Sequence, residues 1–319
     1  QFSTSRLSLL SGSKALPQRY RHRDLKRAAG GFSEDNKIGE GGCSSVYLAK
    51  LPDGSLFALK KLKDGVKKEQ DFVSEIEIIS TLRHRNLLAL EGWCYEKGEA
   101  LLLYRYMSKG SLDQYIYGKK EGLVVLEGDV RLKILAGIAA GLEYLHTGLG
   151  SCILHRDVKA ENVLLTDDLE PLLCDFGLAR LISHNQEVTL TAVGTPGYVA
   201  PELVYTGRGT DKADVYSFGV LLLEMVTRRR GLKDPDNTRQ MVESARNAWH
   251  ERRVEESVDP RVGATCGDTR QLVAFLEVAV ACVADVAAHR PSMDIVSQAL
   301  QQLIRSMENL PPRIHAFSA

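Results

Sequence analysis

His155-Arg-Asp-Val-Lys-Ala-Glu-Asn162, followed thirteen residues later by Asp175-Phe-Gly177, is the stretch of sequence that decides the fold. It places an aspartate, a lysine and an asparagine within six residues, and a second aspartate follows on the next predicted pair of strands. Transfer of a phosphoryl group needs a carboxylate to orient the attacking hydroxyl, a cation near the γ-phosphate and oxygen ligands for Mg²⁺. The stretch supplies all three. Ala200-Pro-Glu202 follows after 22 intervening residues.

Upstream of this stretch, a glycine-rich segment and a lysine fall in a β-rich region. In Ile38-Gly-Glu-Gly-Gly-Cys-Ser-Ser-Val-Tyr47, glycines let backbone N–H groups approach phosphate oxygens. The predicted strand–turn–strand setting disfavours a Walker loop and a Rossmann fingerprint. Lys60 ends a predicted strand, and Glu75, on a predicted helix over 70–82, could pair with it. Taken singly, these features fit a glycine-rich hairpin without a ligand and a solvated strand end equally well.

Secondary-structure signals along the chain predict two lobes of an α+β fold. From Ile38 to about Tyr106 they are mostly strands, including a pair joined by a tight turn at Pro52-Asp53-Gly54. Beyond Gly110, apolar residues recur at helical spacing, as in 215–226 and 272–283. A small β-rich lobe joined to a larger helical one predicts a cleft between them, a usual location for small-ligand sites.

The composition of the chain excludes several classes of protein. The chain has 319 residues with 41 basic and 41 acidic side chains, so its formal charge is zero. This balance removes the case for a protein held to nucleic acid or anionic lipid by its overall field. The longest apolar candidate, 272–288, contains two carboxylates and predicts a core helix instead of a membrane span. Six scattered cysteines without zinc-type spacing predict free thiols in a reducing compartment.

The first thirty residues differ from the rest of the chain. Serines and a threonine crowd residues 3–13, and basic side chains crowd residues 19–27. This composition is typical of a solvated, partly disordered leader, and equally of a regulatory segment that accepts phosphate. Because the chain opens with glutamine and has no signal-peptide pattern, we expect it to be a fragment of a longer protein.

From about Phe32 to Leu303, the ordered motifs together resemble the eukaryotic protein kinases. The resemblance implies a bilobal α+β fold that binds ATP and Mg²⁺, with a small β-rich N-lobe containing one main helix and a larger, mostly helical C-lobe. The implied segments are a leader over 1–31, the N-lobe and hinge over 32–107, the C-lobe over 108–306, and a tail over 307–319.

The resemblance also implies the catalytic roles. Asp157 would be the base, or orienter, for the acceptor hydroxyl, and Lys159 would neutralise charge on the transferring phosphoryl group. Lys60 would contact the α- and β-phosphates and pair with Glu75. The implied magnesium ligands are Asn162 and Asp175.

Nucleotide binding is assigned in the same way. Backbone in the glycine-rich segment would cover the phosphates of ATP, and apolar side chains would pack on both faces of the adenine ring. Tyr104 would be the gatekeeper residue, and the hinge backbone that follows it would hydrogen-bond to the edge of adenine. The implied nucleotide-binding residues are Ile38, Gly39, Glu40, Gly41, Gly42, Cys43, Ser44, Val46, Ala58, Lys60, Tyr104, Arg105, Met107, Ser111 and Leu164.

Regulation is implied by residues around the activation segment. Arg156 and Arg180 would bind a phosphate placed on that segment, for which Thr189 and Thr191 are the available acceptors, and Thr195 would face the acceptor site. The alternative is that Arg156 only caps nearby backbone carbonyls and that the two threonines are exposed loop residues. The resemblance further implies a buried pair between Glu202 and Arg290, and support of the catalytic loop by Asp214.

Lys159 and the stretch Gly194-Thr-Pro-Gly-Tyr-Val-Ala-Pro-Glu202 favour a Ser/Thr kinase over a Tyr kinase. Leu82-Arg-His-Arg-Asn-Leu-Leu, Gly92-Trp-Cys and Tyr106-Met-Ser-Lys-Gly-Ser-Leu112 resemble plant receptor-like kinases of the Pelle/interleukin-1-receptor-associated group. This implies a cytoplasmic domain at the inner face of the plasma membrane, attached to the membrane only through segments absent from this chain. The implied partners are protein substrates and a co-receptor or second copy for trans-phosphorylation, without nucleic acid.

Two residues of the sequence, Ser44 and Cys174, leave alternative interpretations open. Ser44 stands where the family has its third loop glycine, which leaves a pseudokinase scaffold as the main alternative and a small-molecule phosphotransferase as a minor one. Cys174, directly before Asp175, is either a small core residue or a redox-sensitive thiol.

Overall fold

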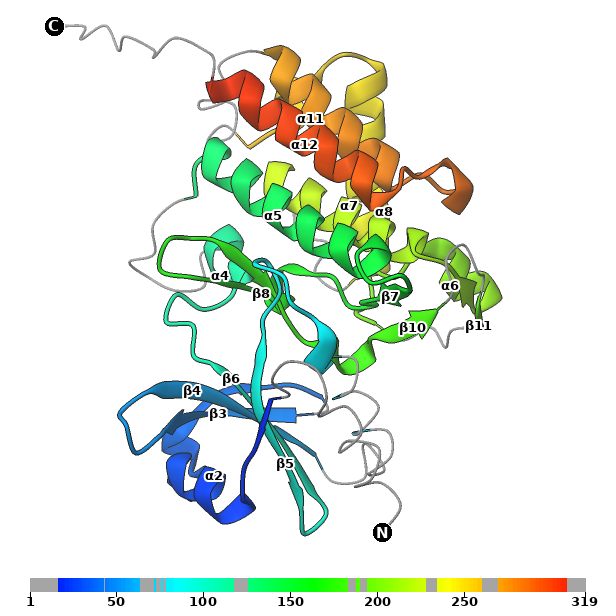
Figure 1. Cartoon of the computed structure of the whole chain (residues 1–319). Helices are drawn as coiled ribbons and strands as arrows, with labels where there is room; N and C mark the ends of the chain where they lie inside the picture. The colour runs from blue at the N-terminus through cyan, green and yellow to red at the C-terminus, as the bar shows by residue number, and fades with distance from the viewer. Residues whose placement is uncertain are drawn as a thin grey trace, which may run out of the picture. The chain divides into compact units, whose positions relative to one another are not determined.

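The structure is a computed structural model that describes residues 17–42, 44–63, 72, 76, 79–117, 126–182, 188–189, 194–227, 234–259 and 269–308. The chain divides into two compact units, of which the first ends at Ser108 and the second begins at Lys109 (Figure 1). The first is built on a β-sheet and the second is mostly helical, which confirms the predicted α+β class.

A six-stranded sheet forms the small unit. Its strand order is β1-β5-β6-β4-β3-β2, and every neighbouring pair is antiparallel except β1 with β5, which is parallel. Gly54, at φ 88°, turns the chain between β3 and β4 at the predicted tight turn. The strands are β1 (Gln18–Arg19), β2 (Lys37–Glu40), β3 (Ser44–Lys50), β4 (Leu56–Leu62), β5 (Leu90–Glu96) and β6 (Glu99–Arg105).

One face of this sheet is covered by helix α2 (His22–Ala28), which lies in the segment that composition alone assigns to a leader. Leu25 and Ala29 are fully buried against Tyr47, Leu59 and Leu103, which stand on the same face of three strands. The solvated-leader interpretation is therefore wrong for residues 17–30, because this segment contributes buried side chains to the core of the small unit. Residues 1–16 lie outside the described part of the chain.

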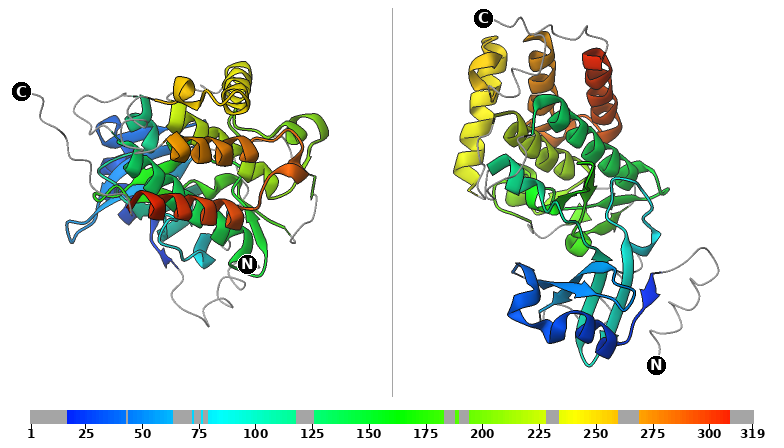
Figure 2. Two further views of the ribbon diagram at one scale, coloured as in Figure 1. Left: turned by 90° about the horizontal axis from the view of Figure 1, so that it is seen from above. Right: turned by 90° about the vertical axis from the view of Figure 1, so that its left-hand side faces the viewer.

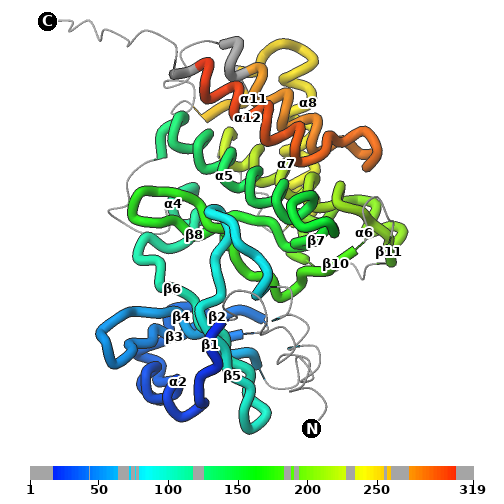
Figure 3. The backbone as a smooth tube through the Cα atoms, in the orientation of Figure 1, coloured from blue at the N-terminus to red at the C-terminus, as the bar shows by residue number. Residues whose placement is uncertain are grey.

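Strand β1 anchors the same segment along the edge of the sheet, beside β5 (Figure 3). The backbone N–H of Tyr20 donates to the carbonyl of Trp93 at 2.9 Å, and the Arg19 guanidinium lies 5.4 Å from the centroid of the Trp93 ring. A Cβ on Gly92 would approach the Tyr20 ring to 2.4 Å, so this contact requires glycine in β5. The imidazole of His22 hydrogen-bonds to Glu99, whose carboxylate also pairs with Lys61.

We expect Leu25→Ala to lower the free energy of unfolding of the small unit by about 2–5 kcal/mol, the usual cost of truncating a fully buried leucine. Urea denaturation followed by circular dichroism measures the change. Arg23→Ala, on the solvent side of the same helix with 75% of the side chain exposed, is the matched control and should change stability by less than about 0.5 kcal/mol. Equal effects of the two substitutions would contradict the packing of α2.

The predicted helix over 70–82 is only partly described. Phe72, Ile76 and Ile79 are helical and at most 1% exposed, which confirms the apolar stripe, and Phe72 packs on Tyr95 with ring centroids 5.5 Å apart. Glu75, the predicted partner of Lys60, lies outside the described residues.

The large unit is organised around α7, almost every residue of which is buried. Helix α5 packs along α12 and α7 packs along α11, and α11 and α12 run side by side (Figure 2). The helices are α4 (Leu112–Tyr117), α5 (Gly128–Thr147), α6 (Pro201–Thr206), α7 (Lys212–Thr227), α8 (Pro235–His250), α9 (Val254–Ser257), α11 (Thr269–Cys282) and α12 (Met293–Glu308).

Strands of two or three residues flank the loops of the large unit. They are β7 (Cys152–Leu154), β8 (Val163–Leu165), β9 (Pro171–Leu173), β10 (Arg180–Ile182), β11 (Val188–Thr189) and β12 (Arg208–Gly209). The core helix expected over 272–288 is confirmed as α11 over its first part, with Phe275, Leu276 and Ala279 buried. Across the described ranges, no helix combines the length and apolar character that a bilayer crossing requires.

A buried ion pair joins three parts of the large unit. Nη2 of Arg131, on α5, lies 2.9 Å from Oδ2 of Asp259, and the two side chains are 3% and 0% exposed. The same guanidinium donates to the carbonyl of Leu126 at 2.8 Å and to that of Met225, near the end of α7, at 2.5 Å. Arg131 thus fastens α5 to the end of α7 and to the segment after α9.

Four cysteines lie in the described part of the chain, and all four are free thiols, as expected. Burial raises the pKa of Cys94, Cys152 and Cys282 to about 12, so these three thiols stay protonated at neutral pH and pack as small core residues.

Candidate active site

Backbone pairing of short strands fixes the loop 155–162. Strand β7 leads into the loop and pairs with β10, while β8 leaves it and pairs with β9. The N–H of Cys174 donates to the carbonyl of Asn162 at 2.9 Å, and Nε2 of His155 lies 3.0 Å from the carbonyl of Cys174. These contacts hold the loop against the residue that precedes Asp175.

Asp214, at the start of α7, holds the loop 155–162 through hydrogen bonds to its backbone. Its carboxylate accepts the backbone N–H groups of His155 at 2.7 Å and Arg156 at 2.8 Å, and Nε2 of His146 lies 3.0 Å from it. Burial would raise the pKa of Asp214, but these partners outweigh it and the pKa is lowered. An ionised Asp214 can thereby hold Arg156 at φ 71°. Sequence reasoning missed His146, because a histidine in an amphipathic helix gives no signal of a partner 68 residues away.

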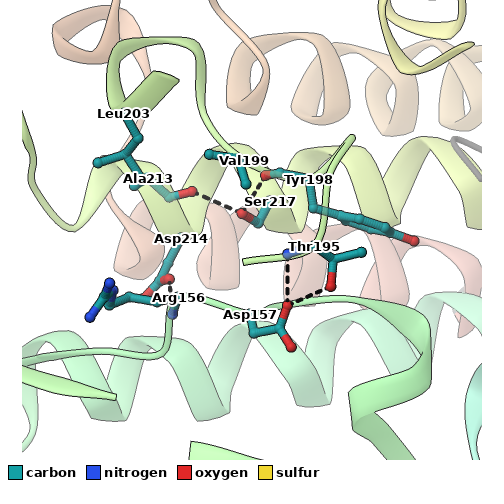
Figure 4. Close-up of a pocket in the computed structure, with 9 residues that line it drawn as sticks. All are labelled: Arg156, Asp157, Thr195, Tyr198, Val199, Leu203, Ala213, Asp214 and Ser217. Atoms are coloured by element: carbon teal, nitrogen blue, oxygen red, sulfur yellow. Dashed lines mark hydrogen bonds between the residues drawn. The ribbon is translucent and has the colours of Figure 1, made fainter. Parts of the chain in front are cut away.

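Asp157 is the centre of a hydrogen-bonded network, of which Figure 4 shows the contacts with Thr195. Its Oδ1 accepts from the backbone N–H of Thr195 at 3.1 Å and from the Thr195 hydroxyl at 2.7 Å. Its Oδ2 lies 2.8 Å from Nζ of Lys159 and accepts from Nδ2 of Asn162, also at 2.8 Å. Nζ of Lys159 in turn donates to the Thr195 hydroxyl at 2.6 Å. The structure therefore brings together four of the predicted site residues.

The network sets the charge of Asp157. Burial would raise the pKa of its carboxyl group, but the hydrogen bond and charge of Lys159, with the donors Thr195 and Asn162, hold the pKa below its ordinary value. Asp157 is therefore ionised at neutral pH and can accept a proton or a hydrogen bond from a hydroxyl group beside it.

A small pocket next to Asp157 contains groups that sequence reasoning missed. The Tyr198 hydroxyl donates to the fully buried carboxylate of Glu224, and Ser217 Oγ donates to the Tyr198 carbonyl at 2.7 Å. These bonds fix the segment after Thr195 to α7. The residues lining the pocket are Arg156, Asp157, Thr195, Tyr198, Val199, Leu203, Ala213, Asp214 and Ser217 (Figure 4).

Asn162 and Asp175 suit a hard divalent cation. Because Nδ2 of Asn162 donates to Asp157, the amide oxygen is turned away from that residue. Asp175, at φ 65°, accepts from the N–H of Gly177 at 3.3 Å, which orients its carboxylate. Among the described residues, no three His, Cys, Asp or Glu side chains gather into a metal cage. One carboxylate and one amide oxygen fit a Mg²⁺ ion that takes its remaining ligands from water and phosphate.

Arg156 and Arg180 lie close enough to interact. Burial lowers the pKa of Arg156, and the charge of Arg180 lowers it further. Nη1 of Arg180 donates to the carbonyl of Thr189 at 3.0 Å, and Thr189 is exposed. Thr191, the other predicted acceptor, lies outside the described residues.

In the small unit, cross-strand register gathers predicted nucleotide-binding residues on the face opposite α2. Val46 pairs with Lys60, and Ala58 pairs with Tyr104 in the next row. Since paired residues share a face and alternate residues return to it, these four side chains stand on one surface.

The glycine-rich turn begins beside that surface. The N–H of Gly41 donates to the carbonyl of Ser44 at 2.8 Å, which closes the turn between β2 and β3 with Ser44 in place of glycine. A Cβ on Gly42 would meet no atom within 4 Å, so packing inside this unit does not require glycine there. Ile38 is 45% exposed, Gly39 pairs with Val46, and Glu40 pairs with Ser45. Cys43 lies outside the described residues.

The remaining predicted positions are placed as follows. Arg105 ends β6 as an exposed residue, and Met107 is half-buried. In the large unit, Ser111 forms an isolated backbone bridge with Leu164, so these two predicted ligand contacts are neighbours. 

Glu202 and Arg290 form the pair that was expected. Nη1 and Nη2 of Arg290 each lie 2.7 Å from one oxygen of Glu202, and the Arg290 side chain is fully buried. This bidentate geometry is the strong form of an arginine–carboxylate contact.

Comparison with known proteins gives consistent matches. Residues 32–313 match the family model described as a protein kinase domain. The chain is 40% identical over 296 residues to the L-type lectin-domain containing receptor kinase IX.1 of Arabidopsis thaliana, covering 90% of this chain and 44% of that protein. It is 40% identical over 273 residues to phytosulfokine receptor 1 of the same plant, covering 84% and 27%. It is 39% identical over 290 residues to the proline-rich receptor-like protein kinase PERK8, again from Arabidopsis thaliana, covering 88% and 42%. The chain thus spans less than half the length of these relatives.

Proposed function

The chain belongs to the protein kinase family, whose members use ATP and a divalent metal ion, and we propose that it transfers the γ-phosphoryl group to serine and threonine hydroxyls of proteins. The observation that carries the proposal is the contact between an ionised carboxylate, Asp157, and a threonine hydroxyl 2.7 Å away, with Nζ of Lys159 touching both. Thr195 stands where a short aliphatic hydroxyl would be presented to Asp157.

In the proposed reaction, the acceptor oxygen bonds to the γ-phosphorus of ATP as the bond to the leaving ADP oxygen breaks. Asp157 orients the acceptor hydroxyl and takes its proton, and Lys159 offsets negative charge on the transferring group. Mg²⁺ held by Asn162, Asp175 and phosphate oxygens would supply further charge neutralisation. Lys60, Val46, Ala58 and Tyr104, which share one face of the sheet, are the residues of the small unit that we propose contact ATP. The presence of Asp157, Lys159, Asn162 and Asp175 supports an active enzyme over the pseudokinase alternative.

Incubating the chain with labelled ATP and Mg²⁺, followed by phosphoamino-acid analysis, tests the proposed activity. We expect label on serine and threonine and little on tyrosine. Predominant phosphotyrosine would contradict the proposed acceptor class, and absence of any label on the chain and on a generic protein substrate would contradict the proposed activity.

We propose further that the chain is part of a longer receptor, because its relatives are named as receptors, and that it acts at the inner face of the plasma membrane. Its partners would be protein substrates and a co-receptor or a second copy. If phosphorylation passes between copies, the initial rate of autophosphorylation per molecule should double when the protein concentration doubles. A rate per molecule that does not depend on concentration would indicate transfer within one chain.

Phosphorylation of Thr189 is the proposed activating event. Arg156 and Arg180 interact unfavourably, and a phosphate carries about −1.5 to −2 charge with three acceptor oxygens. We expect Thr189→Ala to lower turnover about tenfold or more, because each lost charge-assisted hydrogen bond is worth about 1.5–3 kcal/mol. Turnover is compared before and after phosphatase treatment of the parent. Thr147→Ala, at an exposed threonine that ends α5, should leave turnover unchanged. Full activity of both Thr189→Ala and the dephosphorylated parent would refute the switch.

A further inference from the structure

We propose that Arg208 binds the phosphate of phosphorylated Thr189 on the side opposite Arg180, in addition to the two arginines, Arg156 and Arg180, already assigned to it. The inference rests on the function proposed above, in which Thr189 accepts the phosphate. It assigns a recognition role to the turn that follows α6, and Arg208 makes or breaks no covalent bond.

The local sequence fixes where Arg208 stands. Helix α6 ends at Thr206, and Gly207 adopts φ 63°, a left-handed conformation that favours glycine, while its N–H donates to the carbonyl of Leu203 at 3.1 Å. The Thr206 hydroxyl then accepts the backbone N–H of Arg208 at 3.0 Å. This turn reverses the chain within two residues and delivers Arg208 as the first residue of β12.

Strand register places Arg208 beside Thr189. In the antiparallel pair β11–β12, Thr189 is directly opposite Arg208, and both residues are exposed. Directly opposite residues project their side chains to the same face with Cβ atoms about 4.5–5.5 Å apart. An arginine side chain is long enough to reach a phosphate attached to a threonine at that separation.

The side chain of Arg180 contacts the backbone of Thr189. Its Nη1 donates to the carbonyl of Thr189 at 3.0 Å, so one guanidinium already lies at Thr189 while Arg208 stands across the strand pair. Strand β10 carries Arg180, and Figure 1 places β10, β11 and α6 on one side of the large unit. A phosphate on Thr189 would accept charge-assisted hydrogen bonds from both guanidinium groups, and such bonds are about twice as strong as those between neutral groups.

The test is a phosphorus-31 NMR titration of the full chain with phosphothreonine installed at position 189 during translation. Lys60→Met in the same chain prevents the protein from adding other phosphates, so one resonance reports on one site. A free phosphothreonine has a second pKa near 6. We expect the phosphate in the parent to titrate below that value, and Arg208→Gln to raise its second pKa by about half a unit, as expected for removing one charge about 5 Å away through solvent.

Two further variants sharpen the result. Arg208→Lys retains the charge without the planar fork, so it should raise the second pKa less than Arg208→Gln does. Arg239→Gln, at an arginine of α8 with 64% of its side chain exposed, should leave the titration unchanged. A phosphate that titrates identically in the Arg208→Gln variant and in the parent would overturn the inference.

Because the phosphate is installed without the chain's own activity, this outcome is independent of the kinase assay. Failure of autophosphorylation at Thr189 would count against the proposed switch, whereas an unchanged titration would count against Arg208 alone.

Discussion

Asp157→Asn should lower the turnover of phosphate transfer by about 10²–10⁴-fold while the protein stays folded. A positioned general base contributes about this much to rate, and the amide has the shape of the carboxylate without its charge or its capacity to take a proton. The structure gives a second reason: the same carboxylate carries contacts from Thr195, Lys159 and Asn162, so loss of its charge also weakens the alignment of the acceptor site. Steady-state turnover with labelled ATP measures the effect.

Asp53→Asn is the matched control for this substitution. Asp53 is an exposed carboxylate in the turn of the small unit, where it accepts the N–H of Ser55 at 2.9 Å. Its substitution should leave turnover unchanged, and thermal melting of both variants should confirm that each is folded. If the Asp157 variant retained turnover within a factor of three of the parent, Asp157 would not be the base.

Asp259→Asn should lower the free energy of unfolding of the large unit by about 3–5 kcal/mol. Removing one partner of a buried ion pair leaves the other charge in a low-dielectric interior, and that penalty exceeds what the pair contributes when intact. Arg131 is only 3% exposed and joins α5 to the end of α7, so relaxation toward water would require these elements to separate.

A second ion pair in the same unit provides the comparison. Arg246 and Asp285 also approach to 2.9 Å, but their side chains are 25% and 75% exposed. Asp285→Asn should therefore cost at most about 1 kcal/mol. Urea denaturation followed by tryptophan fluorescence can report on the large unit, because one of the two tryptophans of the chain, Trp249, lies there. If the two substitutions lowered the free energy of unfolding by similar amounts, the idea that burial determines the cost of breaking an ion pair would be wrong.

The features that could be predicted best from the sequence are those formed by residues close together in the chain. The loop 155–162 holds Asp157, Lys159 and Asn162 within six positions, so their meeting follows from local chain geometry. The sheet of the small unit was likewise predictable, because the alternation around Val46 and Lys60 and the turn at Gly54 are local signals.

Contacts between distant residues left no such signal. His146 and Asp214 are 68 positions apart, and Arg131 and Asp259 are 128 apart, so neither pair shows a spacing that a sequence pattern can report. The pairing of Thr189 with Arg208 depends on the register of two-residue strands, which is below the length at which alternation can be recognised. The segment 17–30 was misjudged because its basic composition hides a single buried leucine.

The family match begins at Phe32, but the core of the small unit begins earlier in the chain, with β1 and α2. A chain shortened to the bounds of the match would keep every residue assigned to catalysis and would still expose Tyr47, Leu59 and Leu103 on the uncovered face of the sheet. It would also turn β5 into an open edge strand, with unpaired backbone groups where β1 had been. Open edges and uncovered apolar faces both favour self-association, so we expect the shortened chain to aggregate more readily than the chain that keeps the segment before Phe32.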